Sequence, residues 1–313
     1  MNRTIASSLP VEGRPAARRP LRGRLFTAKA WFILPAVIWT CGFTLFPLCY
    51  ALWLSLQQSR GMGRPLEFVG FKGWARLFGD DRVWGSLTFT LGYAIVTVTA
   101  QILLGLGLAL LVNREFRLRG LVRTLLLLPL FATPVGLGYL GRIIYADNGP
   151  INVSLKALFG VSVSWMSGVW SARAAVALLD IWQWTPFCFL ILLAGLQSIP
   201  DDLYEAAQLD TNRWLEVLWH ITLPLLRPLL ALTILLRLVE ALKIIDIPFA
   251  LTAGGPGRAN ETFSIFIYRT AFTGFDVGYA SAASFLFLIV VLVVVNAFVL
   301  FGGFRSSWDL QGR

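Results

Sequence analysis

The segment Glu205-Ala206-Ala207-Gln208-Leu209-Asp210, followed by His220-Ile221-Thr222-Leu223-Pro224, is polar, helical in character and set between two long apolar stretches. These flanking stretches cover about residues 172–195 and 224–247. Each is long enough to cross a ~30 Å hydrocarbon layer as a helix that rises about 1.5 Å per residue. The polar segment between them is therefore expected to leave the membrane and enter water.

The chain as a whole is too apolar for a soluble globular protein, because 57% of its 313 residues are hydrophobic and only 14% are charged. Stretches of roughly 20–26 apolar residues recur along it. They run approximately over 31–56, 87–111, 121–144, 172–195, 224–247 and 278–301. Backbone groups in lipid must bond within their own segment, so each stretch is predicted to be a helix. The expected fold is an all-α membrane protein with six transmembrane helices.

The net charge of +10 is placed asymmetrically along the chain. Basic residues crowd the tail before the first stretch (Arg3, Arg14, Arg18, Arg19, Arg22, Arg24, Lys29) and the link after the second (Arg114, Arg117, Arg119, Arg123). The positive-inside rule assigns both segments to the cytoplasm. With six helices, both termini and the loop 201–222 are then cytoplasmic. The positive charge is interpreted as a topology signal, and no nucleic-acid partner is expected.

Three regions follow from this pattern. Residues 1–28 form a basic cytoplasmic tail whose Pro, Arg and Gly content predicts disorder, 29–305 form a transmembrane domain, and 306–313 form a second cytoplasmic tail. The first apolar stretch is too long for the core of a secretory signal, so it is predicted to be retained. The three cysteines all fall within apolar stretches and are expected to be packing residues that form no disulfide.

The sequence carries no recognisable catalytic chemistry. It contains no G-x-x-x-x-G-K-[ST] phosphate loop, so no ATP site of its own is predicted. Its one histidine, His220, has no Cys/His cluster around it, which disfavours a metal site or a catalytic triad. No catalytic residue, metal or cofactor is assigned, and any energy source must lie in a partner.

The order of residues in the polar loop is more specific than its composition, which alone would suit an amphipathic helix at the membrane surface. Glu-Ala-Ala, an aspartate three residues on, and Ile-x-Leu-Pro before the next apolar stretch resemble the coupling loop of permease subunits in binding-protein-dependent ABC importers. The resemblance implies that this loop enters a cleft of the ATPase through Glu205, Ala206, Ala207, Asp210, Thr211 and Asn212.

The chain departs from that family at Thr211 and Asn212, where Gly-Ala is usual. Asn212 tolerates a left-handed backbone, whereas β-branched Thr211 does so only at a cost. We therefore expect a turn of different shape at this point of the loop.

The resemblance extends over about residues 30–300. Leu251-Thr252-Ala253-Gly254-Gly255-Pro256-Gly257 looks like the outer Thr-x-Gly-Gly-Pro turn of carbohydrate-importer permeases, and Gly278-Tyr279-Ala280-Ser281-Ala282 continues the likeness to a maltose-permease-like first subunit. This implies the type I importer fold in a bacterial or archaeal cytoplasmic (inner) membrane, in contact with lipid. The implied partners are a second permease subunit, an extracytoplasmic solute-binding protein and an ATPase dimer that binds ATP and Mg.

The fifth stretch carries charges of alternating sign, Arg237, Glu240, Lys243 and Asp246, at i,i+3 spacing. On one helix each would neutralise the next. Charges inside a membrane usually face a cavity or a partner. The ladder either locks helices together or lines a polar path, and spacing alone does not distinguish the two.

The fourth stretch places Asp180, Gln183, Trp184 and Phe187 on one face. A carboxylate, an amide and two rings would suit a sugar, although such aromatic stripes are more often core or lipid-facing. Likeness to the maltose transporter implies a substrate path that contains Asp180, Gln183, Trp184, Phe187, Arg237, Glu240 and Ala241, to which Lys243 is added. A neutral polyhydroxylated solute fits this set best, and a phosphorylated one that uses Arg237 remains open.

Two other classes of function are also compatible with the sequence. A secondary transporter driven by an ion gradient could use the fifth-stretch charges as a relay, although no internal repeat is visible. A membrane scaffold could use the loop 201–222 to recruit a partner without transport. Co-purification of an ATPase disfavours the first alternative, and solute uptake disfavours the second.

Overall fold

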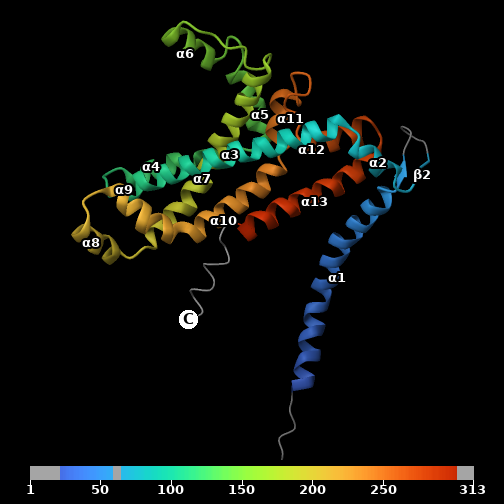
Figure 1. The fold of residues 1–313 in the computed structure, drawn as a ribbon, viewed down its shortest axis with the longest axis horizontal. Helices are drawn as coiled ribbons and strands as arrows, with labels where there is room; N and C mark the ends of the chain where they lie inside the picture. Colours follow the sequence, from blue (N-terminus) through green and yellow to red (C-terminus); the bar gives the residue numbers. More distant parts are fainter. Residues whose placement is uncertain (1–21, 59–64, 302–313) are drawn as a thin grey trace, which may run out of the picture. The chain divides into compact units, whose positions relative to one another are not determined.

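The computed structural model describes residues 22–58 and 65–301, and it is almost entirely helical (Figure 1). It divides into two units, residues 1–50 and 51–313, which are described separately. The first contains most of α1 (Arg22–Leu54). Residues 1–21 of the expected N-terminal tail and the expected tail 306–313 lie outside the described residues, whereas 22–28 form the start of α1.

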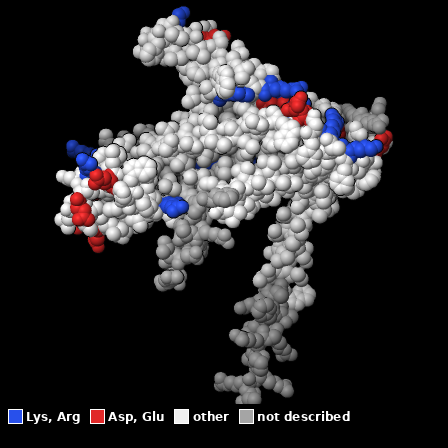
Figure 2. Space-filling model, viewed as in Figure 1, with Lys and Arg blue, Asp and Glu red and all other residues white. Residues whose placement is uncertain are grey.

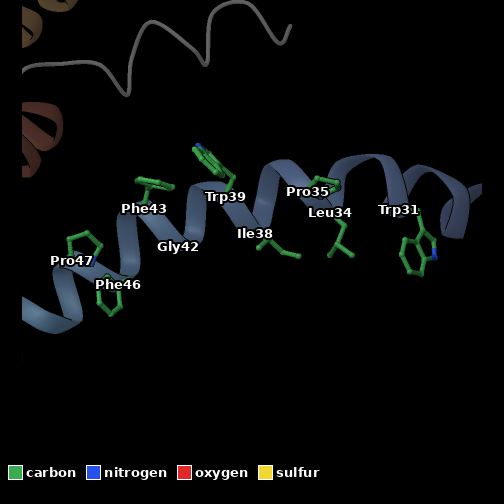
Figure 3. Close-up of a pocket in the computed structure, with 9 residues that line it drawn as sticks. All are labelled: Trp31, Leu34, Pro35, Ile38, Trp39, Gly42, Phe43, Phe46 and Pro47. Carbon is green, nitrogen blue, oxygen red and sulfur yellow. The ribbon is translucent and has the colours of Figure 1, made fainter.

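From Trp31 onward, helix α1 presents an apolar, aromatic surface. Trp39 and Phe43 project from one side of it and Trp31 and Phe46 from the other (Figure 3), and the rings of Trp39 and Phe43 lie 4.4 Å apart. All four side chains are exposed within this unit. A helix that is apolar on every side suits a lipid environment.

After the last residues of α1, the second unit continues with a short antiparallel ribbon of β1 (Gln57–Gln58) and β2 (Glu67–Phe68). Its helices up to the polar loop are α2 (Lys72–Phe78), α3 (Asp81–Asn113), α4 (Arg119–Leu127), the 3-10 turn η1 (Leu128–Phe131), α5 (Pro134–Ile144), α6 (Pro150–Phe159) and α7 (Val169–Gln197). The remainder are α8 (Asp201–Asp210), α9 (Trp214–Val217), the π-helical turn η2 (Leu218–Thr222), α10 (Leu223–Leu242), α11 (Asp246–Thr252), α12 (Phe263–Tyr268), the π-helical turn η3 (Arg269–Thr273) and α13 (Val277–Phe301).

Four of the described helices are long and apolar enough to cross a membrane, or five if one bent pair counts as a single span. The four are Trp31–Leu54, Asp81–Asn113, Val169–Gln197 and Val277–Leu300, and the bent pair is Arg119–Phe131 with Pro134–Ile144. These correspond to five of the six apolar stretches. The stretch at 224–247 contains α10, which carries Arg227, Arg237 and Glu240.

Helices α3, α7 and α10 form the centre of the second unit, and α3 with α7 is the most extensive helix pair (Figure 1). Gly105 allows this close approach, because a Cβ at that position would lie 2.7 Å from Cys188 Cβ and 2.9 Å from Phe189 N. Ala109, Leu192 and Leu226 then bring the three helices together in one apolar cluster.

The stretch predicted as one helix over 121–144 is broken. Helix α4 and η1 end at Phe131, and α5 begins at Pro134 after a bend of 97°. Pro134 lacks an N–H and disfavours helical geometry in the residue before it, so a helix can start at this proline more easily than pass through it. Thr133 caps the new helix, because its hydroxyl accepts from Gly136 N.

The stretch predicted as one helix over 224–247 is also broken, with α10 ending at Leu242 and α11 starting at Asp246. A continuous helix would place the ring of Pro248 against the carbonyl of Ile244. That carbonyl accepts instead from Thr262 Oγ1 at 2.9 Å, and the Lys243 carbonyl accepts from Ser264 Oγ at 3.2 Å. Side chains from the following segment thus satisfy the carbonyls at the break.

Candidate functional site

A buried polar centre joins the three central helices. Arg237 of α10, Asp180 of α7 and Gln101 of α3 are each at most 1% exposed. Gln101 Nε2 donates to Asp180 Oδ2 at 2.9 Å, Arg237 Nε donates to Gln101 Oε1 at 2.9 Å, and Arg237 Nη2 lies 3.7 Å from Asp180 Oδ2. The two charges are therefore paired and bridged by an amide, which offsets the cost of burying them.

Trp184 covers one side of this centre. The Arg237 guanidinium carbon lies 4.4 Å from the Trp184 ring centroid, and the rings of Trp184 and Phe187 meet edge to face at 6.1 Å. Such a contact between a cation and a ring face is attractive, more so away from water. Arg237 Nη1 is buried and has no hydrogen-bond partner among the described residues, so one donor of the centre remains available.

A cavity of about 140 Å³ opens beside Arg237 and Trp184. It is lined by Pro134, Asp180, Trp184, Arg237, Glu240, Lys243, Ile244, Ile245, Asp246 and Ile247. Both helix breaks therefore face it, one through Pro134 and the other through 243–247. Irregular backbone at membrane depth is tolerated where it lines a cavity, and such breaks often mark binding sites.

Charges around the cavity are nearly balanced. Arg237 pairs with Asp180, and Lys243 Nζ donates to Glu240 Oε1 at 3.0 Å. The continuous ladder predicted for a single helix is wrong in two respects, since Arg237 pairs across to α7 and Asp246 starts a different helix. The break after Leu242 explains the position of Asp246, and the packing of α7 against α10 explains the pairing of Arg237.

The polar loop forms a compact helical pair. Pro200 precedes α8, and Asp201 and Asp202 occupy its first turn, where carboxylates favour the positive end of the helix dipole. The hydroxyls of Tyr204 and Thr222 lie 3.3 Å apart and connect α8 to η2. In Figure 2 charged side chains gather at this end of the second unit and near α2 and α12, with mostly uncharged surface between.

This loop also exposes large apolar side chains. Leu209 is 89% exposed, Trp214 64% and Trp219 65%. Glu205, Ala206 and Asp210 are exposed beside them, whereas Ala207 is buried. A cluster of exposed apolar residues with acidic neighbours is typical of a surface that another protein covers.

Thr211 has an extended backbone, with φ −148° and ψ 142°. Its hydroxyl accepts from Arg213 N at 3.2 Å and donates to Glu216 Oε2 at 2.5 Å, so it stabilises the start of α9. The cost expected for a left-handed Thr211 does not arise. Within the described residues, positive φ at non-glycine positions occurs only at Ala253 and Phe275.

A family model described as "Binding-protein-dependent transport system inner membrane component" matches residues 101–302, which contain the cavity, the loop and both helix breaks. The chain belongs to this family. It is therefore a multi-pass permease of a prokaryotic inner membrane. Such permeases are non-catalytic and carry no cofactor, and the ATPase is a separate component.

Individual relatives agree with this assignment. The permease is 36% identical to the probable ABC transporter permease protein y4oQ of Sinorhizobium fredii over 93% of this chain and 94% of the relative. It is 34% identical to the trehalose/maltose transport system permease protein MalF of Thermococcus litoralis, over 88% and 93%. A chain of a bacterial alginate ABC transporter crystal structure is similar in fold, with a TM-score of 0.78, 24% identity and coverage of 91% and 97%.

The structure of the permease brings together five of the eight residues expected on the substrate path. Asp180, Trp184, Arg237, Glu240 and Lys243 line the cavity. The other three, Gln183, Phe187 and Ala241, do not line it.

Gln183 Nε2 donates to the Ala132 carbonyl at 2.7 Å and so holds the break before α5. Ala241 is buried in the apolar cluster between α3, α7 and α10, and Phe187 packs against that cluster. Sequence reasoning missed Gln101, although a lone amide within the apolar stretch 87–111 was a signal. It also missed Pro134, whose helix-breaking chemistry pointed to the bend.

Proposed function

We propose that this permease moves a sugar or related polyhydroxylated solute inward, as one half of a heterodimer with a second permease subunit. In this arrangement six spans, including the two broken ones, place both termini and the loop 201–222 in the cytoplasm. Relatives named as permeases for trehalose/maltose, trehalose and lactose support a carbohydrate substrate. The observation that carries the proposal is the cavity at the two helix breaks, with Trp184 as its aromatic wall.

The charge balance of the cavity favours a neutral solute over a phosphorylated one. Both cations in its lining are paired with carboxylates, and Asp246 adds a further negative charge. A phosphate group would need a surplus of positive charge. An aromatic wall with exposed carboxylate and ammonium groups beside it suits sugar hydroxyls and an apolar sugar face.

The small volume of the cavity supports a substrate path that is formed by two subunits. Its volume of about 140 Å³ is below the ~300 Å³ at which small-molecule pockets usually begin. A disaccharide would need more space than this chain encloses. We infer that a second permease subunit supplies the rest of the wall.

Coupling to ATP takes place at the exposed face of α8 and α9. ATPase closure would pull on this loop and switch the path between inward- and outward-open states. Glu205, Asp210 and the exposed apolar side chains near them form the contact, with Ala206 giving room for close approach and Thr211 holding the start of α9. Asn212 is exposed in the turn between the two helices.

The test is ATP-dependent solute uptake into vesicles that contain the complete complex, with the variant Glu205→Arg. Reversal of this exposed charge is expected to abolish uptake and to reduce retention of the ATPase on the purified permease, with expression unchanged. Glu115→Arg is the matched control, because Glu115 is an exposed glutamate on the proposed cytoplasmic side outside this loop. Normal uptake by Glu205→Arg, or uptake that follows a proton gradient without ATP, would contradict the proposal.

A further inference from the structure

The ends of α3 and α7 meet the start of α4 beside the polar loop. Helix α3 ends at Asn113, α7 ends at Gln197 and α4 begins at Arg119. Val122 of α4 packs against the same apolar cluster as Tyr204 of α8. A ligand bound at this junction would therefore lie next to the loop that is proposed to contact the ATPase.

Two guanidinium groups lie next to each other at this junction. Arg119 Nε donates to the Val112 carbonyl at 3.0 Å. With its oxygen turned toward the arginines, the Gln197 amide accepts from Arg123 Nη2 at 2.5 Å and from Arg119 Nη2 at 2.7 Å. Like charges at i,i+4 repel each other, and here they share one neutral acceptor. We call Arg119, Arg123 and Gln197 the arginine site.

The described residues supply no counter-charge to the arginine site. The link 114–123 contains four arginines and one acidic residue, the exposed Glu115. Within residues 22–58 and 65–301, none of these four arginines forms an ion pair. Arg123 Nε is buried and has no hydrogen-bond partner there. A buried donor without an acceptor is costly, so the site calls for an acceptor from outside the chain.

Helix dipoles offset only part of the positive charge. Helices α3 and α7 both end at the arginine site, and each helix C-terminus carries roughly half a negative charge. The N-terminus of α4, at Arg119, adds a positive charge of similar size. The site therefore keeps a surplus of roughly one to two positive charges. A group with one negative charge and several acceptor oxygens would largely neutralise it.

The surface of α4 beside the site is apolar. Leu121, Leu125 and Leu128 recur at i, i+4 and i+7, so they lie along one side of the helical segment, and each is more than half exposed. Arginines at one end of a helix and exposed leucines along its side are typical of a segment at a membrane surface. Basic pockets between helices at the cytoplasmic side of a membrane bind anionic headgroups. The leucines favour a lipid over a soluble anion, which would leave them uncovered.

We propose that the arginine site binds the phosphodiester group of an anionic phospholipid, whose acyl chains lie along Leu121, Leu125 and Leu128. The assignment of this lipid to the cytoplasmic leaflet rests on the proposed function and its topology. Phosphate oxygens accept well from the planar fork of an arginine, and Arg123 has its Nε to donate. The bound headgroup would hold the ends of α3, α4 and α7 together beside the polar loop.

The test titrates the purified complete complex in neutral detergent with phosphatidylglycerol and counts bound lipid by native mass spectrometry. The wild-type complex is expected to bind at least one phosphatidylglycerol that phosphatidylcholine does not replace. Arg123→Gln should raise the half-saturating concentration for that molecule about tenfold, since a charge-assisted hydrogen bond is lost. Arg123→Lys, which keeps the charge but not the fork, should raise it about threefold.

Two further variants separate the site from general effects of charge. Arg227→Gln is the matched control, because Arg227 is an exposed arginine near the start of α10 that forms no ion pair among the described residues. It should bind phosphatidylglycerol as wild type does. Leu125→Asn leaves both arginines in place and should weaken binding severalfold, since part of the apolar contact with the acyl chains is lost.

The other outcomes count against the lipid. Unchanged binding by Arg123→Gln, or an equal loss in Arg227→Gln, overturns the proposal. Displacement of the lipid by inorganic phosphate would assign the site to a soluble anion. If Arg123→Gln releases the ATPase and leaves lipid binding unchanged, the missing acceptor is a carboxylate of the ATPase, which also overturns it. Lipid binding is measured without ATP, so a wild-type complex that binds the lipid but takes up no solute contradicts the proposed function alone.

Discussion

Arg237 illustrates how one residue can be predicted as important and yet have its partners misjudged. Its spacing on the fifth stretch suggested Glu240 as the neutralising group, but the guanidinium is 1% exposed and binds Gln101 and Asp180 on other helices. Contacts between α3, α7 and α10 join residues 57 to 136 positions apart in sequence. Spacing within one helix cannot reveal such pairs, so the residue was predictable and its network was not.

Substitution of Arg237 should destabilise the permease mainly through the charge that it leaves behind. Arg237→Met removes the partner of buried Asp180, which costs about 3–5 kcal/mol of folding free energy in comparable sites. The double variant Arg237→Met with Asp180→Leu should recover most of this loss. Thermal unfolding of the purified permease in detergent measures both. A double variant no more stable than Arg237→Met would show that the two charges are not energetically coupled.

At the scale of elements, the polar loop and the broken helices show different degrees of predictability. The polar segment was expected to be helical with a turn at Thr211 and Asn212, and it forms the two short helices α8 and α9 on either side of residues 211–213. The breaks in 121–144 and 224–247 were missed because both stretches are apolar enough to be continuous helices. Pro134 and Pro248 were the available signals, but α7 runs through Pro186 and α1 through Pro35 and Pro47. A proline alone therefore does not decide where a membrane helix ends.

The Thr211 hydroxyl should matter for the shape of the proposed coupling loop. Thr211→Val keeps the side-chain volume but loses the bonds to Arg213 N and Glu216, so α9 is expected to lose about 1 kcal/mol of stability. Retention of the ATPase on the permease should fall, whereas Thr211→Ser should bind the ATPase as wild type does. The measurement is the dissociation constant of the ATPase for permease in detergent or nanodiscs. If the ATPase bound the valine and serine variants with equal affinity, the Thr211 hydroxyl would have no role in this interaction.

At the scale of the whole molecule, the class of protein could be predicted from the sequence, but the residues that line the cavity could not all be predicted. Apolar stretches, charge asymmetry and the loop motif predicted an all-helical membrane permease, which the family match and the fold similarity confirm. The cavity depends on where two helix breaks meet, α5 against α11, and this pairing is set by packing that no local pattern encodes. Three of the eight expected path residues consequently face other parts of the fold.

The charge balance of the cavity leads to a prediction for the whole transporter. With Asp180 against Arg237, Glu240 against Lys243, and Asp246 in excess, the solute should be uncharged. In a panel of neutral saccharides and sugar phosphates, those that stimulate ATPase activity and enter the vesicles are expected to be neutral. Preferential uptake of a phosphorylated sugar would show that Arg237 is released from Asp180 during transport and would contradict the assignment.

The buried centre of Arg237, Gln101 and Asp180 has a mechanical consequence. Together with the contact of Gly105 against Cys188, it joins α3 to α7 at two levels, and Arg237 adds α10 at one of them. We expect the three helices to move together, because sliding α7 against α10 would separate a buried charge from its counter-charge, and sliding α3 would remove the amide that bridges them. We therefore expect the hinges of the permease at the two helix breaks beside the cavity, before Pro134 and after Leu242.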